Sequence, residues 1–272
     1  MTLLSRKGMR RLCQAAVALS FILIPWLNGL DIRSVSGNLL SLEFFKVPFA
    51  DPLAALQVWA TTEHLALTVS VGAGLALLLA AVMGPVFCSW ICPFGLLADL
   101  VAKLPFVRRP APSLKAWYGK SILFGAVVAV LAVFGYPPLL DQLSLPGWYT
   151  RTMQGLWLSG AVPAGFWLLP AAVGLDLAAG GHAWCRHVCP QALLLQWAGH
   201  LLPVRFRVKY DPSRCICGEP ADSPCSLACP HGLDPRKRNI HPQCTNCGDC
   251  VVRCTHFGHA LSQGFARRKR LS

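Results

Sequence analysis

The cysteines near the end of this chain have the spacing of a ferredoxin loop. Cys244, Cys247, Cys250 and Cys254 form a C-x-x-C-x-x-C-x-x-x-C run, which in bacterial ferredoxins wraps thiolates around a [4Fe–4S] cluster. Zinc is the alternative metal, but zinc sites pair two C-x-x-C units across roughly a dozen or more residues. Three evenly spaced cysteines followed by a fourth therefore favour iron–sulfur chemistry.

A second run of cysteines precedes this loop with a less regular spacing. Cys217 and Cys225 are separated by the insert GEPADSP, whereas Cys225 and Cys229-Pro230 have the ordinary spacing. In two-cluster ferredoxins the fourth cysteine of a run serves the other cluster. This crossed rule predicts one [4Fe–4S] cluster on Cys229, Cys244, Cys247 and Cys250, and a second on Cys215, Cys217, Cys225 and Cys254. Because the spacing is stretched, zinc or a vestigial site stays open for the second set.

Two further thiol pairs repeat a single motif, aromatic-C-x-x-β-branched-C-P. They are Cys88 with Cys92 in FCSWICP, and Cys185 with Cys189 in WCRHVCP. Proline suits the first position of a helix, so each second cysteine is expected at a helix N-terminus, where a thiolate or an anionic cluster is favoured. The four thiols could bind a third cluster or a metal, exchange disulfides or contact a partner. The alternative is that they are buried small residues.

The composition indicates that membrane-spanning helices position these cysteines. The chain is 54% hydrophobic and 14% charged, whereas soluble domains carry about 25% charged residues. Four apolar segments, about 12–30, 65–87, 122–140 and 155–177, approach the roughly 20 residues that cross a bilayer. The first lacks a small-x-small cleavage site, so we expect it to be retained. We therefore predict an all-α membrane protein with four transmembrane helices in a duplicated two-helix arrangement.

The basic residues predict the orientation of these helices. Lys and Arg number 4 before the first segment, 2 in 31–64, 5 in 88–121, 1 in 141–154 and 13 in 178–272. This alternation follows the positive-inside rule and places both termini in the cytoplasm of a bacterial cell, with the protein in the inner membrane. The net charge of +13 is explained in this way, and no recognition helix points to nucleic acid.

The chain changes character near residue 203, which predicts two domains. Residues 1–202 would form the membrane domain, in which 93–104 and 190–202 are short helices along the inner surface. Residues 204–210 alternate like a short strand. Residues 203–272 hold eight of the 13 cysteines, so we expect a small cytoplasmic ferredoxin-like domain that needs clusters to fold.

Polar residues on the predicted outer side are candidates for a quinol site. Asp51, Glu63 and His64 could accept protons from a quinol, although ordinary interfacial polarity explains them as well. His182, His187 and His200 are expected at the membrane surface.

With these residues in view, the chain resembles the NapH/MauN family of polytopic ferredoxin-type membrane proteins. The resemblance includes RLCQ at 11–14, VPFADPL at 47–53, both Cys-Pro motifs and the cysteine-rich tail. It implies electron transfer from the quinol pool toward a periplasmic redox system of the nitrate-reductase or methylamine-utilisation type. It also implies a ferredoxin-type partner subunit, and a periplasmic redox enzyme or cytochrome.

The predicted function is therefore that of a membrane-bound [4Fe–4S] electron carrier, the membrane component of a quinol dehydrogenase rather than a stand-alone enzyme. An accessory protein that helps to mature a periplasmic redox enzyme is the alternative.

Overall fold

The computed structural model describes residues 6–29, 35–37, 39, 41–44, 47–62, 64–108, 113–134, 139–217, 223–237 and 242–267. Within these residues the chain forms two successive sets of helices and a tail. The first set is α1 (Arg6–Gly29), α2 (Pro52–Thr62), α3 (Leu67–Met83), α4 (Val86–Trp90) and α5 (Pro93–Val101). The second is α6 (Leu114–Phe134), η1 (Leu140–Leu143), α7 (Leu145–Ser159), η2 (Ala164–Trp167), α8 (Leu168–Ala179), α9 (Ala183–His187) and α10 (Pro190–Leu201).

The tail contributes β4 (Val204–Tyr210), η3 (Pro212–Arg214), α11 (Pro224–Leu227), α12 (Asp249–Cys254) and β5 (Leu261–Arg267). β4 pairs with β5 in antiparallel register, with Val204 opposite Arg267 and Tyr210 opposite Leu261. The strand predicted at 204–210 is therefore confirmed. A second sheet forms between α1 and α2 from β1 (Val35–Gly37), β2 (Leu42–Phe44) and β3 (Val47–Phe49). With two sheets present, the prediction of an all-α protein is wrong.

The prediction of four transmembrane helices is also wrong. In the described part of the chain, only α6 is both long and apolar enough to cross a membrane. α3 has 17 residues, about 25 Å at 1.5 Å per residue, against a bilayer core of about 30 Å. α1 is long enough, but it carries four basic residues in its first six positions and buries the polar side chains of Arg10 and Gln14.

The apolar segment 155–177 fails as a single span because it is broken. α7 ends at Ser159, and Gly160 follows with a left-handed φ of 64°. Pro163 then precedes η2 and α8. A count of apolar residues does not detect such a break, although the backbone changes direction there.

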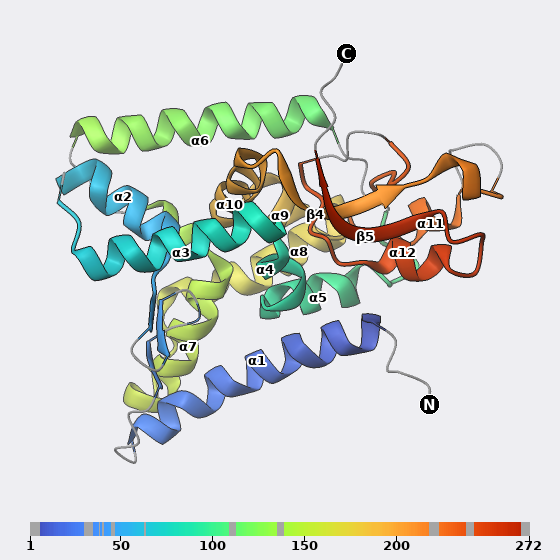
Figure 1. Cartoon of the computed structure of the whole chain (residues 1–272). Coiled ribbons are helices and arrows are strands. Elements are labelled where there is room, and N and C mark those ends of the chain that lie inside the picture. The colour runs from blue at the N-terminus through green and yellow to red at the C-terminus, as the bar shows by residue number, and fades with distance from the viewer. Residues whose placement is uncertain are drawn as a thin grey trace.

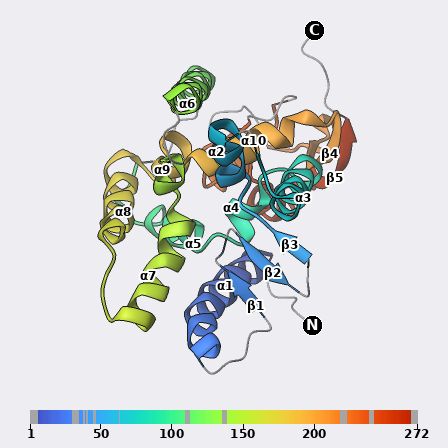
Figure 2. The same cartoon turned by 90° about the vertical axis from the view of Figure 1, so that its left-hand side faces the viewer.

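The long helices enclose the short ones that carry the Cys-Pro motifs. α6 and α1 lie on opposite sides of the molecule, and the tail sits at one end, next to the start of α1 (Figures 1 and 2). α10 packs on α3 through Leu195, Ala198 and Ala80. Nine of the twelve residues of α10 are buried, among them Leu193 and Leu194. The helices predicted at 93–104 and 190–202 exist as α5 and α10, but α10 belongs to the core and not to a membrane surface.

Candidate iron–sulfur centres

The structure brings the first predicted set of tail cysteines together. Cys229, Cys244, Cys247 and Cys250 line one cavity, which also contacts Val208 and Leu233. We call this set tail site I. The loop needs two left-handed residues to wrap around the cavity, Asn246 with a φ of 54° and Gly248 with a φ of 84°. Asparagine and glycine are the residues that adopt this conformation most readily.

The loop of tail site I is fastened to the helical part of the molecule. The side-chain amide of Asn246 donates hydrogen bonds to the carbonyl oxygens of Met83 (2.8 Å) and Phe206 (2.9 Å). Gly84, just after α3, has a φ of 75°, and a Cβ there would lie 2.8 Å from this amide. Glycine is therefore needed where the tail meets the end of α3.

The second predicted set also surrounds one cavity. Cys215, Cys217, Cys225 and Cys254 line it together with Tyr210, Phe257 and Leu261, and we call this set tail site II. Burial raises the pKa of Cys217, and the nearby thiols of Cys215, Cys225 and Cys254 raise it further. Residues 218–222 of the stretched insert lie outside the described residues, yet the cysteines on both sides of the insert reach the same site.

The arrangement of these thiols fits a cluster. Among the described residues, no three His, Cys, Asp or Glu side chains converge closely enough to hold a single metal ion. A [4Fe–4S] cube takes one thiolate at each iron corner, so its ligands surround a cavity, as they do at both tail sites.

The Cys-Pro motifs fold twice into the same local structure. In each motif the N–H groups of the last β-branched residue and of the second cysteine both bond to the aromatic carbonyl, Phe87 in the first copy and Trp184 in the second. The second cysteines, Cys92 and Cys189, have extended backbones immediately before the N-terminal prolines of α5 and α10. The predicted helix starts are confirmed.

The tertiary structure then joins the two copies. Cys88, Cys92, Cys185 and Cys189 belong to one buried core cluster, and we call this set the Cys-Pro site. Burial raises the pKa of all four thiols, to about 12 for Cys92, and neighbouring thiols raise the pKa of Cys88, Cys92 and Cys185 further. Such thiols stay protonated without a metal, and an iron cluster would deprotonate them on binding.

Polar side chains from the two long helices support the Cys-Pro site in matching ways. From α1, the Gln14 amide donates to the Cys92 carbonyl at 3.3 Å. From α6, the Lys120 ammonium donates to the carbonyls of Cys189 (2.8 Å) and Cys185 (3.2 Å). The two copies differ in charge, because one supporting group is neutral and the other is cationic.

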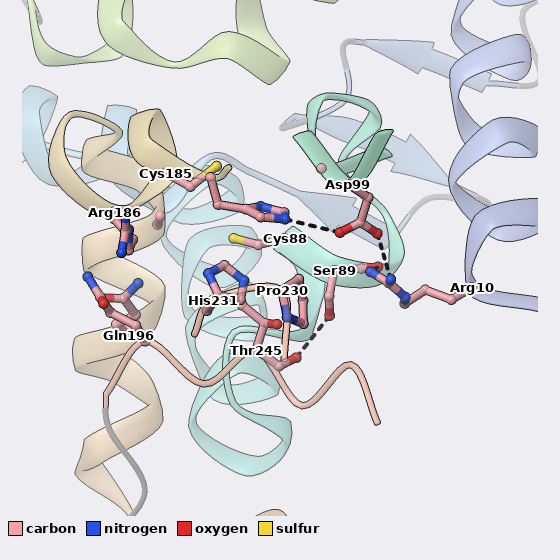
Figure 3. A pocket seen from close by; sticks show the side chains of 14 residues that line it. Arg10, Cys88, Ser89, Asp99, Cys185, Arg186, Gln196, Pro230, His231 and Thr245 are labelled. Atoms are coloured by element: carbon pink, nitrogen blue, oxygen red, sulfur yellow. Dashed lines mark hydrogen bonds and ion pairs between the residues drawn. The ribbon is translucent and has the colours of Figure 1, made fainter. Parts of the chain in front are cut away.

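A buried polar network lies between the Cys-Pro site and tail site I (Figure 3). Arg10, which is 2% exposed, pairs with Asp99 at 2.5 Å and with Asp249 at 3.2 Å. The His182 ring hydrogen bonds to the other oxygen of Asp99 at 3.0 Å and packs on the His231 ring at 4.5 Å between centroids. Burial opposes the charge on Asp99, but the His182 hydrogen bond and the nearby cations hold the pKa of this carboxyl below its usual value.

The quinol-site candidates are not gathered into one site. Asp51 is 4% exposed, and burial together with Asp141 raises its pKa to about 7. His64 is exposed in the segment between α2 and α3. Glu63 lies outside the described residues.

The sequence interpretation missed the network around Arg10. His182 was expected at a surface, but it is 5% exposed, so that prediction is wrong. A signal for Asp99 was present, because it is the single acidic residue between Glu63 and Asp141. An isolated carboxylate in so apolar a stretch must find a partner when it is buried.

Comparison with known proteins supports the iron–sulfur interpretation. A family described as "4Fe-4S binding domain" matches residues 65–112 and 161–209. Each match contains one Cys-Pro motif, and both end before the first tail cysteine. No solved structure matches the chain.

Named relatives cover most of the chain. The ferredoxin-type protein NapH of Escherichia coli is 31% identical over 91% of this chain and 85% of the relative. The methylamine utilization ferredoxin-type protein MauN of Methylobacillus flagellatus is 30% identical over 83% of this chain and 77% of the relative. NapH of Haemophilus influenzae is 28% identical over 94% of this chain and 89% of the relative. These similarities confirm the resemblance found in the motifs, and the chain belongs to the NapH/MauN family of ferredoxin-type proteins.

Proposed function

We propose that this protein is a membrane-bound iron–sulfur electron carrier that takes electrons from quinol for a periplasmic redox system. The observation that carries the proposal is the grouping of the eight tail cysteines, four around each of two cavities. Family membership supports the coarser part, an iron–sulfur electron-transfer protein. A bound [4Fe–4S] cluster supplies one-electron chemistry at a potential set by its surroundings.

Two short segments of the tail connect the two sites. α12 carries Cys250 of tail site I at its start and Cys254 of tail site II at its end. α11 and the residues that follow it carry Cys225 of site II and Cys229 of site I. Each short segment therefore supplies one ligand to each site, and the covalent backbone connects the two sites twice.

The exposed face of α6 supports attachment to a membrane. Large apolar side chains on this helix are exposed, with exposed fractions of 73% for Ile122, 80% for Val133 and 68% for Phe134. Exposure of apolar side chains to water is unfavourable, and contact with lipid removes this cost. One apolar helix supports attachment to a membrane. That both termini lie in the cytoplasm is a further part of the proposal.

Asp51 is the best placed proton acceptor for a quinol. Quinol oxidation releases protons together with electrons, so a nearby base must take the protons. A pKa of about 7 allows a carboxylate to accept a proton near neutral pH. Its neighbour Asp141 is paired with Arg151 at 2.5 Å.

The proposal is tested by anaerobic reduction of the purified full-length protein in lipid vesicles. Menaquinol or ubiquinol is added, with and without a ferredoxin-type partner subunit, and cluster reduction is followed by EPR. We expect reduction in at least one of these mixtures. The matched variants are Cys247→Ser, which removes a tail-site ligand, and Cys13→Ser, which changes a half-buried thiol outside all three sites.

Loss of signal in the Cys247→Ser protein alone supports the assignment of tail site I. Clusters that dithionite reduces but quinol never does, alone or with the partner, would disprove the quinol role. An accessory role in maturation of a redox enzyme would then be the better explanation.

A further inference from the structure

We propose that a basic cavity between α1, α5 and the tail binds the phosphate headgroup of an anionic phospholipid. The inference rests on the membrane attachment contained in the proposed function, and it does not depend on quinol as the electron donor.

The cavity lies between the start of α1, the end of α5 and the tail loop that follows α11. We call it the basic cavity, and its charged lining residues are Lys7, Arg10, Arg11, Asp99, Lys103, Arg108 and Asp249. Its volume is about 210 Å³, whereas one water molecule needs roughly 10–15 Å³ by the same measure. The cavities at the two tail sites and beside the Cys-Pro site measure about 20 Å³ or less. The basic cavity therefore admits a group much larger than water.

The positive charge of the basic cavity exceeds what its own carboxylates neutralise. Five of its lining residues are cationic, and two, Asp99 and Asp249, are anionic. Both carboxylates pair with Arg10. Within the described part of the chain, no carboxylate forms an ion pair with the remaining cations, which are Lys7, Arg11, Lys103 and Arg108. An anionic ligand would supply the missing negative charge.

The cations of the cavity also repel one another and leave donors unsatisfied. Desolvation lowers the pKa of the Lys103 ammonium, and the charges of Arg11 and Lys7 lower it further. Among the described residues, the buried Nε atoms of Arg10 and Arg11 have no hydrogen-bond partner. A buried donor without a partner is costly, and more so when it is charged. Because α1 begins beside the cavity at Arg6, its N-terminus adds to the positive potential there.

Exposed apolar side chains follow the cationic ones on both helical walls of the cavity. Leu12 comes directly after Arg11, and Leu104 comes directly after Lys103. Both leucines are exposed, and so is Phe106. A soluble phosphate gains nothing from such neighbours, and a protein interface normally has a polar rim. The acyl chains of a phospholipid would cover these side chains once its headgroup is bound.

The position of the cavity agrees with the level of lipid headgroups. α6 is the helix proposed to enter the membrane, and its start at Leu114 lies at the same end of the molecule as the start of α1 and the tail (Figure 1). Headgroups lie at the ends of a membrane-spanning helix. The basic cavity therefore lies near the headgroups of one leaflet, where basic pockets bind anionic lipids.

The test is native mass spectrometry of the purified full-length protein in a non-ionic detergent, titrated with phosphatidylglycerol. Wild type is expected to retain this lipid, and to retain neither phosphatidylcholine nor inorganic phosphate at the same concentration. Lys7→Gln/Lys103→Gln removes two exposed cations of the cavity. This change is expected to weaken binding by about 30-fold, because each basic side chain near an anionic lipid contributes about fivefold.

The matched control is Lys209→Gln/Arg214→Gln, which removes the same charge from exposed positions of β4 and η3 outside the cavity. It should keep the wild-type affinity. If the Lys7→Gln/Lys103→Gln protein does not fold, Lys103→Gln alone is measured, with a loss of about fivefold expected and an unchanged affinity contradicting the proposal.

Equal affinity of wild type, the cavity variant and the control for phosphatidylglycerol would overturn the assignment of the lipid to this cavity. Equal retention of inorganic phosphate would overturn the lipid as the ligand in favour of a soluble anion. Wild type that retains no phosphatidylglycerol would also overturn it, and the acidic surface of a partner protein would then be the better occupant. These failures are distinct from failure of the proposed function, because reduction of the clusters by quinol is measured separately by EPR.

Discussion

The Ser89 hydroxyl donates a hydrogen bond to the backbone carbonyl of Thr245 across 2.9 Å. Ser89 lies between Cys88 and Cys92, and Thr245 lies between Cys244 and Cys247. Both residues are 5% exposed. One buried bond therefore joins the loop of the Cys-Pro site directly to the loop of tail site I (Figure 3).

Ser89→Ala should lower the free energy of unfolding, because it removes the direct hydrogen bond between these two loops. The change leaves the Thr245 carbonyl buried without this partner, at a cost of about 1–3 kcal/mol. Denaturant unfolding would measure the loss of stability. Ser70→Ala, whose hydroxyl bonds to a carbonyl one turn away in the same segment, should cost less. A free energy of unfolding for Ser89→Ala equal to that of wild type would contradict the role of this bond.

Arg10→Met should destabilise the protein strongly. The guanidinium is the buried counter-ion of both Asp99 and Asp249 and also donates to the Ser89 carbonyl at 3.3 Å. Removing one partner of a buried ion pair costs about 3–5 kcal/mol. Denaturant unfolding would measure the loss of stability. Arg11→Met, the same substitution at the next position of α1, is the control. A loss no larger than that of Arg11→Met would contradict the assigned role.

Gly95→Ala should destabilise the packing around the Cys-Pro site. A Cβ at Gly95 would lie 2.4 Å from the Cys88 carbonyl and 3.0 Å from the Gln14 amide, so the backbone around Cys88 must move. Overpacking of this kind costs about 1–3 kcal/mol. Denaturant unfolding would measure the loss of stability, and a value equal to that of wild type would contradict the clash. Gly74→Ala, where nothing lies within 4 Å, serves as the control and should be neutral.

Asp51 should make the free energy of unfolding fall as the pH rises from about 4 to about 7. The folded protein keeps this carboxyl protonated up to a pKa of about 7, against 3.8 for the free side chain. The folded state therefore binds more protons in that window, and the stability contribution is lost as pH passes through the folded pKa. The expected size is on the order of a few kcal/mol.

Thermal unfolding of wild type and Asp51→Asn between pH 4 and 8 would check this. The difference between the two proteins should change across the window and become constant above it. Parallel curves throughout would show that Asp51 titrates normally in the folded state.

The iron–sulfur interpretation depends mainly on short-range patterns in the sequence. The grouping of tail cysteines follows from short-range spacing, because residues within one tight loop must lie near one another, and the structure places both predicted sets around single cavities. The helix starts at Pro93 and Pro190 and the strand at 204–210 were also predictable, since they depend on local preferences. Hydropathy overestimated the membrane spans because it does not register the breaks after Met83 and Ser159.

The relation between the sites depends on contacts between segments that are distant in sequence. Arg10, Asp99 and Asp249 are far apart in sequence, and no local pattern predicts that α1, α5 and α12 bring them together. The four Cys-Pro thiols likewise meet only because the two helical sets pack face to face, burying one pair from each. Packing of distant segments, and not spacing along the chain, creates the buried connection between the Cys-Pro site and tail site I.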